Sequence, residues 1–202
     1  WRFPESDSVP EKFQIAIKYF EDEYFDYHLG VNPISFVRAI KQNINEGRIV
    51  SGASTLTMQT IRLSRKGESR TFFEKFIEMI LSTRLEMSKS KESIMKLYTS
   101  HAPFGGNVVG LDAASWRYYK RAPFQLSWGE ITTLAVLPNA PSLIYPGKNH
   151  KLLLEKRNKL LDKLLEHEEI DSLTCDLAKM EPLPNSPHNL PQITPHLLNR
   201  LI

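Results

Sequence analysis

The sequence predicts a mainly α-helical fold, and three observations support this. Apolar residues recur three and four positions apart along most of the chain, as they do on one face of a helix. Ser, Thr and Asn stand where these segments begin, which is typical of helix N-caps. Alternating runs of β-branched residues are few, and no internal repeat is present. At 202 residues, the simplest organisation is one domain with a tail.

The first predicted helix starts at a capping box over residues 8–11 and runs into an acidic, aromatic stretch at 21–30. Its expected buried face comprises Phe13, Ile15, Ala16, Ile17 and Phe20. A second helix is expected from Asn32 and Pro33, an N-cap and first-turn pair, to Gly47. It carries Arg38 on one side and Phe36, Val37 and Ile40 on another.

Small hydroxyl residues at 52–57 predict the start of a third helix, with Ser54 as its expected N-cap. Thr71 and Glu74 form a capping box that opens a fourth helix, and Ser90 is the expected cap of a fifth. The fourth helix is expected to bury one apolar stripe, made of Phe73, Phe76, Ile77, Ile80 and Leu85.

The C-terminal half predicts a loop at 101–107, a helix rich in Ala and aromatic residues, and a helix that begins at Ser127 and ends near Leu137. A long polar helix over 149–167 and a shorter one over 171–180 follow. Residues 181–196 hold five of the thirteen Pro and no helical period, which predicts a linker. The expected division is a domain over residues 1–180 and a Pro-rich linker over residues 181–202.

The composition excludes several classes of protein. The net charge of +3, from 26 basic and 23 acidic residues, suits an anionic ligand or membrane surface and gives no support for a nucleic-acid binder. A single Cys175 excludes an internal disulfide and a Cys-rich metal site. No run approaches the roughly 20 apolar residues of a membrane span. Because the chain begins at Trp1 without Met, we expect a fragment whose membrane anchor is missing.

The stretch Glu21–Gly30 interleaves four acids with three aromatic residues and one His. A carboxylate among aromatic rings is partly desolvated, which raises its pKa and makes it a better base. The alternative for this stretch is an acidic helix end with a structural His. The sequence contains no HExxH, no CxxC and no phosphate-binding GxxxxGK loop.

The other polar groups that stand out suit glycosyl transfer from a diphosphate donor. Acids can activate a hydroxyl, amides and hydroxyls can hold sugars, and cations can neutralise phosphates. The candidates comprise carboxylates, hydroxyls, an amide and cations: Glu21, Glu78, Ser54, Thr55, Thr57, Gln59, Arg62, Arg70, Lys75 and Arg84.

Five ordered motifs resemble the peptidoglycan glycosyltransferase domain (glycosyltransferase family 51) of class A penicillin-binding proteins. The first three are Glu21-Asp22-x-x-Phe25-x-x-His28-x-Gly30, Gly52-x-Ser54-Thr55-Leu56-Thr57-x-Gln59 and Lys75-x-x-Glu78. The fourth is Ala102-Pro103-Phe104-Gly105-Gly106 with the aromatic helix behind it, and the fifth is Leu137-Pro138-Asn139-Ala140-Pro141. Met58 and the loop at 102–106 resemble the penicillin-binding protein 1C type in particular.

The resemblance implies a two-lobed, lysozyme-like helical domain with a membrane-facing jaw between the first two motifs. Its substrates would be lipid II and the nascent glycan chain, at the periplasmic face of the inner membrane. A transpeptidase domain would follow in the full-length protein. No nucleic acid is expected as a partner. The reaction would invert the donor MurNAc C1 and release polyprenyl diphosphate.

The resemblance also implies roles for single residues. Glu21 would be the general base, and Glu78 a second catalytic acid that positions substrate. The alternative for Glu78 is a plain intrahelical pair with Lys75. Substrate-binding positions would be Ser54, Thr55, Gln59, Arg62, Arg70, Lys75, Arg38 and His28. For His28, a structural hydrogen bond is favoured over proton transfer, and for the cations the alternative is solvated loop charge.

No cofactor and no protein-bound metal are expected, with Mg²⁺ or Mn²⁺ only as an aid to the diphosphate. The family inhibitor moenomycin is expected to bind. Two departures leave other functions open: Glu74 stands where the family carries Arg, and Tyr98-Thr99-Ser100 where it carries Tyr-Leu-Asn. The alternatives are a catalytically weakened scaffold that binds lipid II or divisome partners, and a lysozyme-like lytic enzyme.

Overall fold

The computed structural model describes residues 8–34, 41, 54–65 and 71–188. These residues are mainly helical, as predicted, and within them the backbone forms only isolated bridges, Pro103 with Val109 and Tyr145 with Lys148, and no strand. The elements are α1 (Glu11–Glu21), η1 (Phe25–Tyr27), α3 (Leu56–Ser64), α4 (Phe72–Ser88), α5 (Lys91–His101), α6 (Leu111–Tyr119), η2 (Pro123–Gln125), α7 (Trp128–Val136), α8 (His150–Glu166) and α9 (Ser172–Met180).

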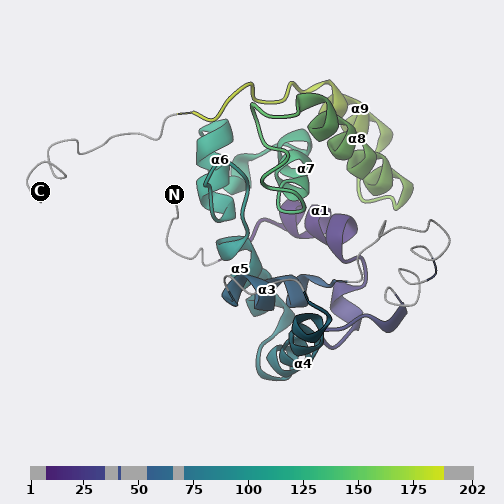
Figure 1. The fold of residues 1–202 in the computed structure, drawn as a ribbon. Coiled ribbons are helices and arrows are strands. Elements are labelled where there is room, and N and C mark those ends of the chain that lie inside the picture. The colour runs from purple at the N-terminus through teal and green to yellow at the C-terminus, as the bar shows by residue number, and fades with distance from the viewer. Residues whose placement is uncertain (1–7, 35–40, 42–53, 66–70, 189–202) are drawn as a thin grey trace, which may run out of the picture.

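Helix α7 is the centre of the larger helix group. Every residue from Gly129 to Val136 is buried, and α1, α6, α8 and α9 all pack against it (Figure 1). Its buried hydroxyls are satisfied inside the helix, since Thr133 donates to the Gly129 carbonyl at 2.7 Å. Helix α7 passes so close to α9 at Gly129 that a larger residue would clash, because a Cβ there would lie 2.7 Å from the Ala178 carbonyl. The C-terminal helices therefore close around α7.

A second group is formed by α3, α4 and α5, in which α3 packs against both of the others. Figure 1 shows α1 between the two groups, with the segment after α1 reaching down toward α4. The last residues of α1 thus lie where the two groups meet. This position matters for the site described below.

The predicted caps are mostly confirmed. Thr71, Ser90 and Ser127 each accept a hydrogen bond from a backbone N–H of the first turn, and Ser127 and Glu130 close a full capping box. The predicted start of the first helix is wrong, because α1 begins at Glu11 after Pro10 with no side-chain cap. The cap of α3 is Thr55 and not Ser54, and its Oγ1 accepts from the Met58 N–H at 3.1 Å.

The apolar stripe predicted for α4 is wrong in orientation. Phe73, Phe76 and Ile80 are 72%, 59% and 53% exposed, whereas Glu78 and Ser82 of the same helix are buried. Ile77 and Leu85 are half-buried. Helix α4 faces α3 with its polar side because Glu78 and Glu86 bond to side chains of α3. Its largest apolar side chains are left on the outside.

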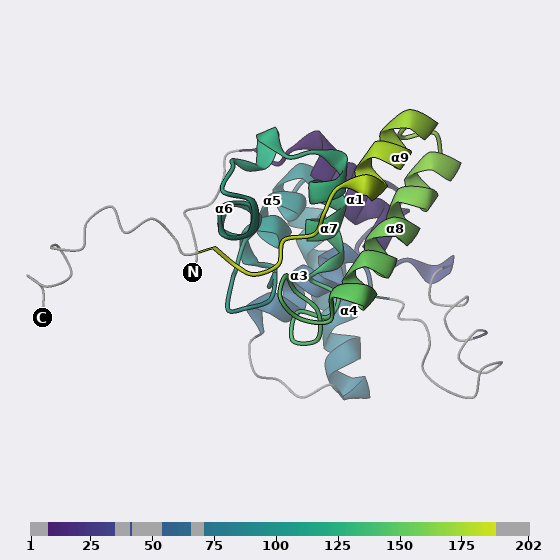
Figure 2. The same cartoon turned by 90° about the horizontal axis from the view of Figure 1, so that it is seen from above.

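Residues 181–188 lie along the C-terminal helix group rather than apart from it (Figure 2). The buried Arg157 donates to the Glu181 and Lys179 carbonyls at 2.6 and 2.8 Å, and the His188 N–H donates to the Arg117 carbonyl at 2.7 Å. Leu183 is buried. The division at residue 180 stays a prediction, and the packed part of the chain continues to residue 188.

Three predicted features lie outside the described residues. Of the stretch predicted as the second helix only residues 32–34 and 41 are described, so the jaw and Arg38 fall outside, as does Arg70. Among the helices that the structure describes, none is long and apolar enough to cross a membrane.

Candidate active site

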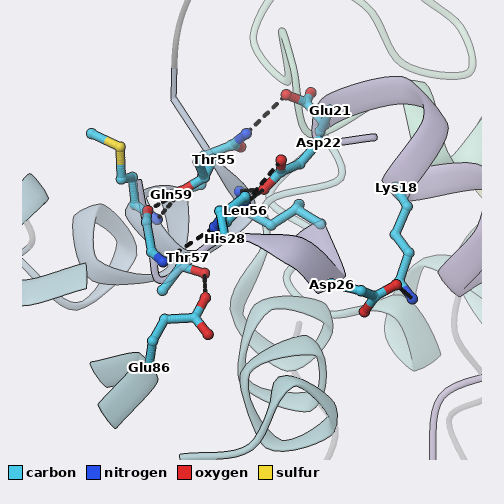
Figure 3. A network of polar contacts seen from close by, with 12 residues as sticks. Lys18, Glu21, Asp22, Asp26, His28, Thr55, Leu56, Thr57, Gln59 and Glu86 are labelled. Atoms are coloured by element: carbon cyan, nitrogen blue, oxygen red, sulfur yellow. Dashed lines mark hydrogen bonds and ion pairs between the residues drawn. The ribbon is translucent and has the colours of Figure 1, made fainter. Parts of the chain in front are cut away.

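Glu21 is the last residue of α1, and the helix ends there because Asp22 leaves the helical backbone with φ −158° and ψ 74°. A carboxylate at this end faces the negative pole of the helix dipole, which disfavours its charged form. Its Oε2 accepts a hydrogen bond from Gln59 Nε2 of α3 at 2.8 Å (Figure 3). Glu21 therefore joins the two helix groups through one amide.

Asp22 anchors the turn that follows. Its buried carboxylate accepts from His28 Nε2, at 3.1 Å to Oδ1 and 2.9 Å to Oδ2, and from the Leu56 N–H at 2.9 Å (Figure 3). His28 Nδ1 accepts from the Gly30 N–H at 3.1 Å, so the ring proton sits on Nε2 and points at Asp22. With both nitrogens engaged inside the fold, His28 has the position of a structural residue. Its predicted contact with substrate stays a prediction.

Gly30 and Thr55 connect this turn to the second motif. The Thr55 hydroxyl donates to the Gly30 carbonyl at 2.6 Å while capping α3. Gly30 has φ +85°, and a Cβ there would lie 2.5 Å from the Ser82 backbone of α4. Only Gly fits, because the turn passes directly over α4. Thr55 therefore holds backbone, which leaves Gln59 as the residue of this motif that reaches Glu21.

The pKa of Glu21 is raised above its ordinary value, chiefly because burial disfavours the carboxylate. The hydrogen bond from Gln59, the nearby Asn139 amide and the Lys156 charge act in the opposite direction, and the Asp22 charge adds slightly to the rise. Oε1 is buried and has no hydrogen-bond partner among the residues that the structure describes. Asn139 stands beside the carboxylate but outside hydrogen-bond geometry with Oε1. Such a carboxylate is suited to accept a proton.

Glu78 of α4 is held by Arg62 of α3 in a two-pronged ion pair. Arg62 Nε and Nη2 donate to the two carboxylate oxygens at 2.6 and 2.7 Å. This pair raises the pKa of Arg62, so its guanidinium stays charged. The geometry favours Arg62 over Lys75 as the main partner of Glu78, because Lys75 Nζ lies farther away, at 3.8 Å from Glu78 Oε2.

Ser54 is the point on which two cations converge. Its hydroxyl accepts from Arg62 Nη2 at 3.2 Å and also from Lys75 Nζ. Two positive donors aimed at one oxygen form a position that a phosphate oxygen could also occupy. The structure thus brings together Ser54, Arg62, Lys75 and Glu78. The first and last of these residues are 24 positions apart in the sequence.

Glu74, the acid that departs from the family pattern, is paired with a neighbour. Arg65 donates to its two oxygens at 3.1 and 2.9 Å. Its backbone N–H donates to the Thr71 cap, but the carboxylate does not complete the predicted capping box and turns to Arg65 instead. The negative charge of Glu74 is therefore locally balanced.

The two acids are related through α3. Gln59 and Arg62 stand three residues apart on that helix, which places them on neighbouring positions of one face. Gln59 reaches Glu21 and Arg62 reaches Glu78. The charge of Glu21 also acts on Arg62, raising its pKa slightly further. One helix face therefore presents both carboxylates.

Three residues of this site escaped the sequence-based prediction of site residues. Asp22 belongs to the first motif but not to the predicted site residues, and it is buried. Asn139 and Lys156 come from after α7 and from α8, more than 100 residues beyond Glu21. Asn139 could have been predicted as a site residue because it belongs to the fifth motif. Lys156 lies in a polar helix, and no feature of the sequence distinguishes it.

A separate cavity of about 630 Å³ lies between α6, α7 and residues 181–188. Its charged groups are already engaged, since Arg121 pairs with the helix-capping Glu130 and Ser127 donates to Glu181. None of the predicted site residues lines it. The chemistry therefore concentrates around α3.

Comparison with known proteins gives concordant matches. Residues 2–165 match the family model described as transglycosylase. Penicillin-binding protein 1C of Escherichia coli is 37% identical over all of this chain and 26% of its own length. Penicillin-binding protein 1A of Aquifex aeolicus is 33% identical over 88% of this chain and 24% of its own length. The chain thus spans about a quarter of these two relatives.

Among solved structures, the crystal structure of penicillin-binding protein 1A from Haemophilus influenzae is 30% identical to the chain. It aligns with 47% of this chain and 14% of its own, with a TM-score of 0.45.

Proposed function

The chain belongs to the transglycosylase family, and we propose that it is a peptidoglycan glycosyltransferase that polymerises lipid II into glycan strands. The observation that carries the proposal is one face of α3 that holds two carboxylates by different means. Glu21 is desolvated with Oε1 left without a partner in the described residues, and Glu78 is locked in an ion pair. One acid is suited to move a proton, and the other to organise cations.

In the proposed reaction, Glu21 takes the proton from the 4-hydroxyl of the acceptor GlcNAc. The freed oxygen attacks the anomeric carbon of the donor MurNAc, and the bond from that carbon to the diphosphate breaks. Polyprenyl diphosphate leaves with the bonding electrons, and the configuration at the anomeric carbon inverts. Burial and the helix dipole both raise the pKa of Glu21, which favours proton uptake at this step.

The leaving diphosphate needs charge neutralisation more than a strong acid. Arg62 and Lys75 supply this charge, with their donors converging on Ser54. Because Glu78 already binds two donors of Arg62, its part is to fix the direction of the guanidinium. Arg38 and Arg70 are proposed to extend the cationic surface toward the acceptor.

No cofactor is proposed. Among the residues that the structure describes, no three His, Cys, Asp or Glu side chains are grouped as metal ligands. A divalent ion, Mg²⁺ or Mn²⁺, is proposed only to bind the substrate diphosphate. EDTA should therefore slow the reaction but not abolish it, and complete loss with EDTA that Mg²⁺ restores would contradict this.

The proposed location is the periplasmic face of the inner membrane, where lipid II and the growing glycan remain anchored. The exposed face of α4 supports contact with lipid, because Phe73, Phe76 and Ile80 recur at helical spacing on one side. Leu29 is exposed in the turn that Gly30 packs against α4. In a longer protein, a transpeptidase domain is the proposed neighbour.

The test is incubation of the chain with labelled lipid II and separation of the products by size. We expect polymer from the unchanged chain and a loss of at least about 100-fold with Glu21→Gln, because the general base is removed. Glu23→Gln is the matched control, since this acid lies two residues beyond the end of α1 and pairs with Lys163 at 2.7 Å. Polymer from Glu21→Gln at the normal rate would refute the assigned base.

The same assay separates the two alternatives. A lytic enzyme would shorten finished glycan and leave lipid II unchanged. A scaffold would bind lipid II without forming polymer at any protein concentration. Moenomycin at 100 times its Kd should stabilise the fold by about 2.7 kcal/mol if its site is intact.

A further inference from the structure

Lys156 of α8 reaches the end of α1 at Phe20, the residue before Glu21, although it lies 135 residues beyond Glu21 in the chain. Its Nζ donates to Asn139 Oδ1 at 2.7 Å, and its ammonium lies 5.8 Å from the centre of the Phe20 ring. An ammonium group can only donate, so the amide oxygen of Asn139 must face Lys156. The amide NH₂ group is thereby directed away from Lys156.

Asn139 and Lys156 both act on Glu21. The amide of Asn139 and the charge of Lys156 each lower the pKa of Glu21 against the larger opposing effect of burial. The carboxylate in turn favours the charged form of Lys156, whose pKa is lowered overall by burial. Gln59 of the α3 group bonds to Oε2, and Asn139 from the α7 group acts on the same carboxylate.

We propose that Lys156 is a positioning residue for Glu21: by binding the Asn139 oxygen near the end of α1, it fixes the orientation of that amide, and with its own charge it keeps the Glu21 carboxylate ionised for the acceptor hydroxyl. The inference rests on the proposed function for its catalytic meaning. Its structural content, a link from Lys156 to the ionisation of Glu21, can be measured without substrate.

Other titratable groups near Glu21 also affect its ionisation, and the effect of Lys156 has to be compared with theirs. Asp22 from the same turn opposes ionisation. Arg62 of α3 is engaged by Glu78, and Tyr98 of α5 has a pKa well above its usual range because it is fully buried. Lys156 is therefore the cation from α8 that balances Asp22.

The first experiment is an NMR titration of the Glu21 carboxyl carbon, assigned by its absence in Glu21→Gln. In Lys156→Met, which keeps the aliphatic stem against Phe20, we expect the Glu21 midpoint to move up by about one pH unit. Lys156→Arg should restore it. Lys159→Met is the matched control, because Lys159 lies on the same helix and pairs with the exposed Glu155.

The second experiment is the pH profile of lipid II polymerisation. The acidic limb of kcat should move up by the same amount in Lys156→Met, so that kcat falls by up to about tenfold below the midpoint and recovers above it. KM should change less than about twofold, since Lys156 is not proposed to touch substrate. Asn139→Ala should also lower kcat. In a chain that already carries Asn139→Ala, Lys156→Met should lower kcat by less than it does in the unchanged chain.

The outcomes separate the two hypotheses. If the unchanged chain makes no polymer but the Glu21 midpoint still moves in Lys156→Met, the proposed function fails and the link from Lys156 to Glu21 stands. If the chain is active and the midpoint and acidic limb are the same in Lys156→Met, the inference is overturned. A lowered melting temperature shared by Lys156→Met and Lys156→Arg, with no change in midpoint, would also overturn it in favour of a packing role.

Discussion

The interior around α7 and the interface between α3 and α4 bury different kinds of side chain. Around α7 the interior is mainly apolar, with Ile131, Leu134 and Val136 fully buried. Between α3 and α4 the interior is polar: Arg62 binds Glu78, and Thr57 binds Glu86 at 2.6 Å. The aromatic side chains of α4 lie outside. The interior around α7 is thus a conventional core, and the α3–α4 interface resembles a site, with the apolar face of α4 turned outward.

This difference indicates that the apolar interior around α7 mainly stabilises the fold, whereas the polar α3–α4 interface is better explained by function. Burying apolar surface stabilises a fold, whereas burying ion pairs seldom gains net free energy. The buried carboxylates of Glu78 and Glu86 and the exposed Phe73–Ile80 face are therefore poor choices for folding alone. They make sense if the polar interior meets a substrate and the apolar exterior meets lipid, as proposed above. Four variants test this comparison.

The largest effect is expected in the apolar group. Leu134→Ala should lower the free energy of unfolding by about 3 kcal/mol, because it removes a fully buried side chain and leaves a cavity. Denaturant unfolding monitored by circular dichroism measures this. Loss below about 1 kcal/mol would mean that α7 is not the centre of the stable core.

A somewhat smaller loss is expected where the polar group is held together. Glu78→Gln should lower the free energy of unfolding by about 2 kcal/mol, because it weakens two charged hydrogen bonds and leaves Arg62 without its counter-charge. Arg62 is partly solvated, which limits the loss. Glu92→Gln is the control, since that acid pairs with Lys96 on the surface, and its melting temperature should not change. Equal effects of the two changes would contradict the comparison.

Glu21→Gln should stabilise the fold near neutral pH. Burial raises the pKa of Glu21 in the folded state above 4.5, its ordinary value, so ionisation favours the unfolded chain. The stability that protonated Glu21 contributes is present below the ordinary value and is lost as pH rises through the raised folded value. The variant should therefore melt at a higher temperature at pH 7 to 8 and at the same temperature near pH 4. A lower melting temperature at pH 7 would show that the charge supports the fold.

The smallest effect on stability is expected on the outer face of α4. Phe73→Ser with Phe76→Ser should change the free energy of unfolding by less than about 0.5 kcal/mol, because both rings are largely exposed. The same variant should lose most of its co-sedimentation with vesicles containing anionic lipid. Leu173→Ser with Leu177→Ser, on the exposed face of α9, is the control for general stickiness. Unchanged vesicle binding in the α4 variant would remove the support for a lipid contact.

Much of the fold could be predicted from the sequence because helix starts and periods are local. Ser90 and Ser127 mark α5 and α7, and the periods predict α8 and α9 to within one residue of the observed bounds. The predicted family is also confirmed. The stripe of α4 was placed on the wrong side because periodicity defines an apolar face but not the neighbour that it meets.

For the candidate site, too, the sequence predicted some residues and missed others. Motifs identified Glu21, Gln59 and Glu78, since each belongs to a short pattern, and the family resemblance added Arg62. Asp22 could not be told from surface charge, because its partners are the Leu56 N–H and His28 across a turn. Lys156 could not be found at all.

The sequence by itself determined most of the helices, several of their caps, the family and the two candidate acids, because these depend on neighbouring residues and short patterns. The tertiary structure decided the surroundings of each acid. Glu21 is left with a buried oxygen that accepts no hydrogen bond from the described residues, and Glu78 is saturated by Arg62. The reason is physical: desolvation and pairing depend on which atoms from distant segments surround a carboxylate, and those segments meet only when the two groups pack.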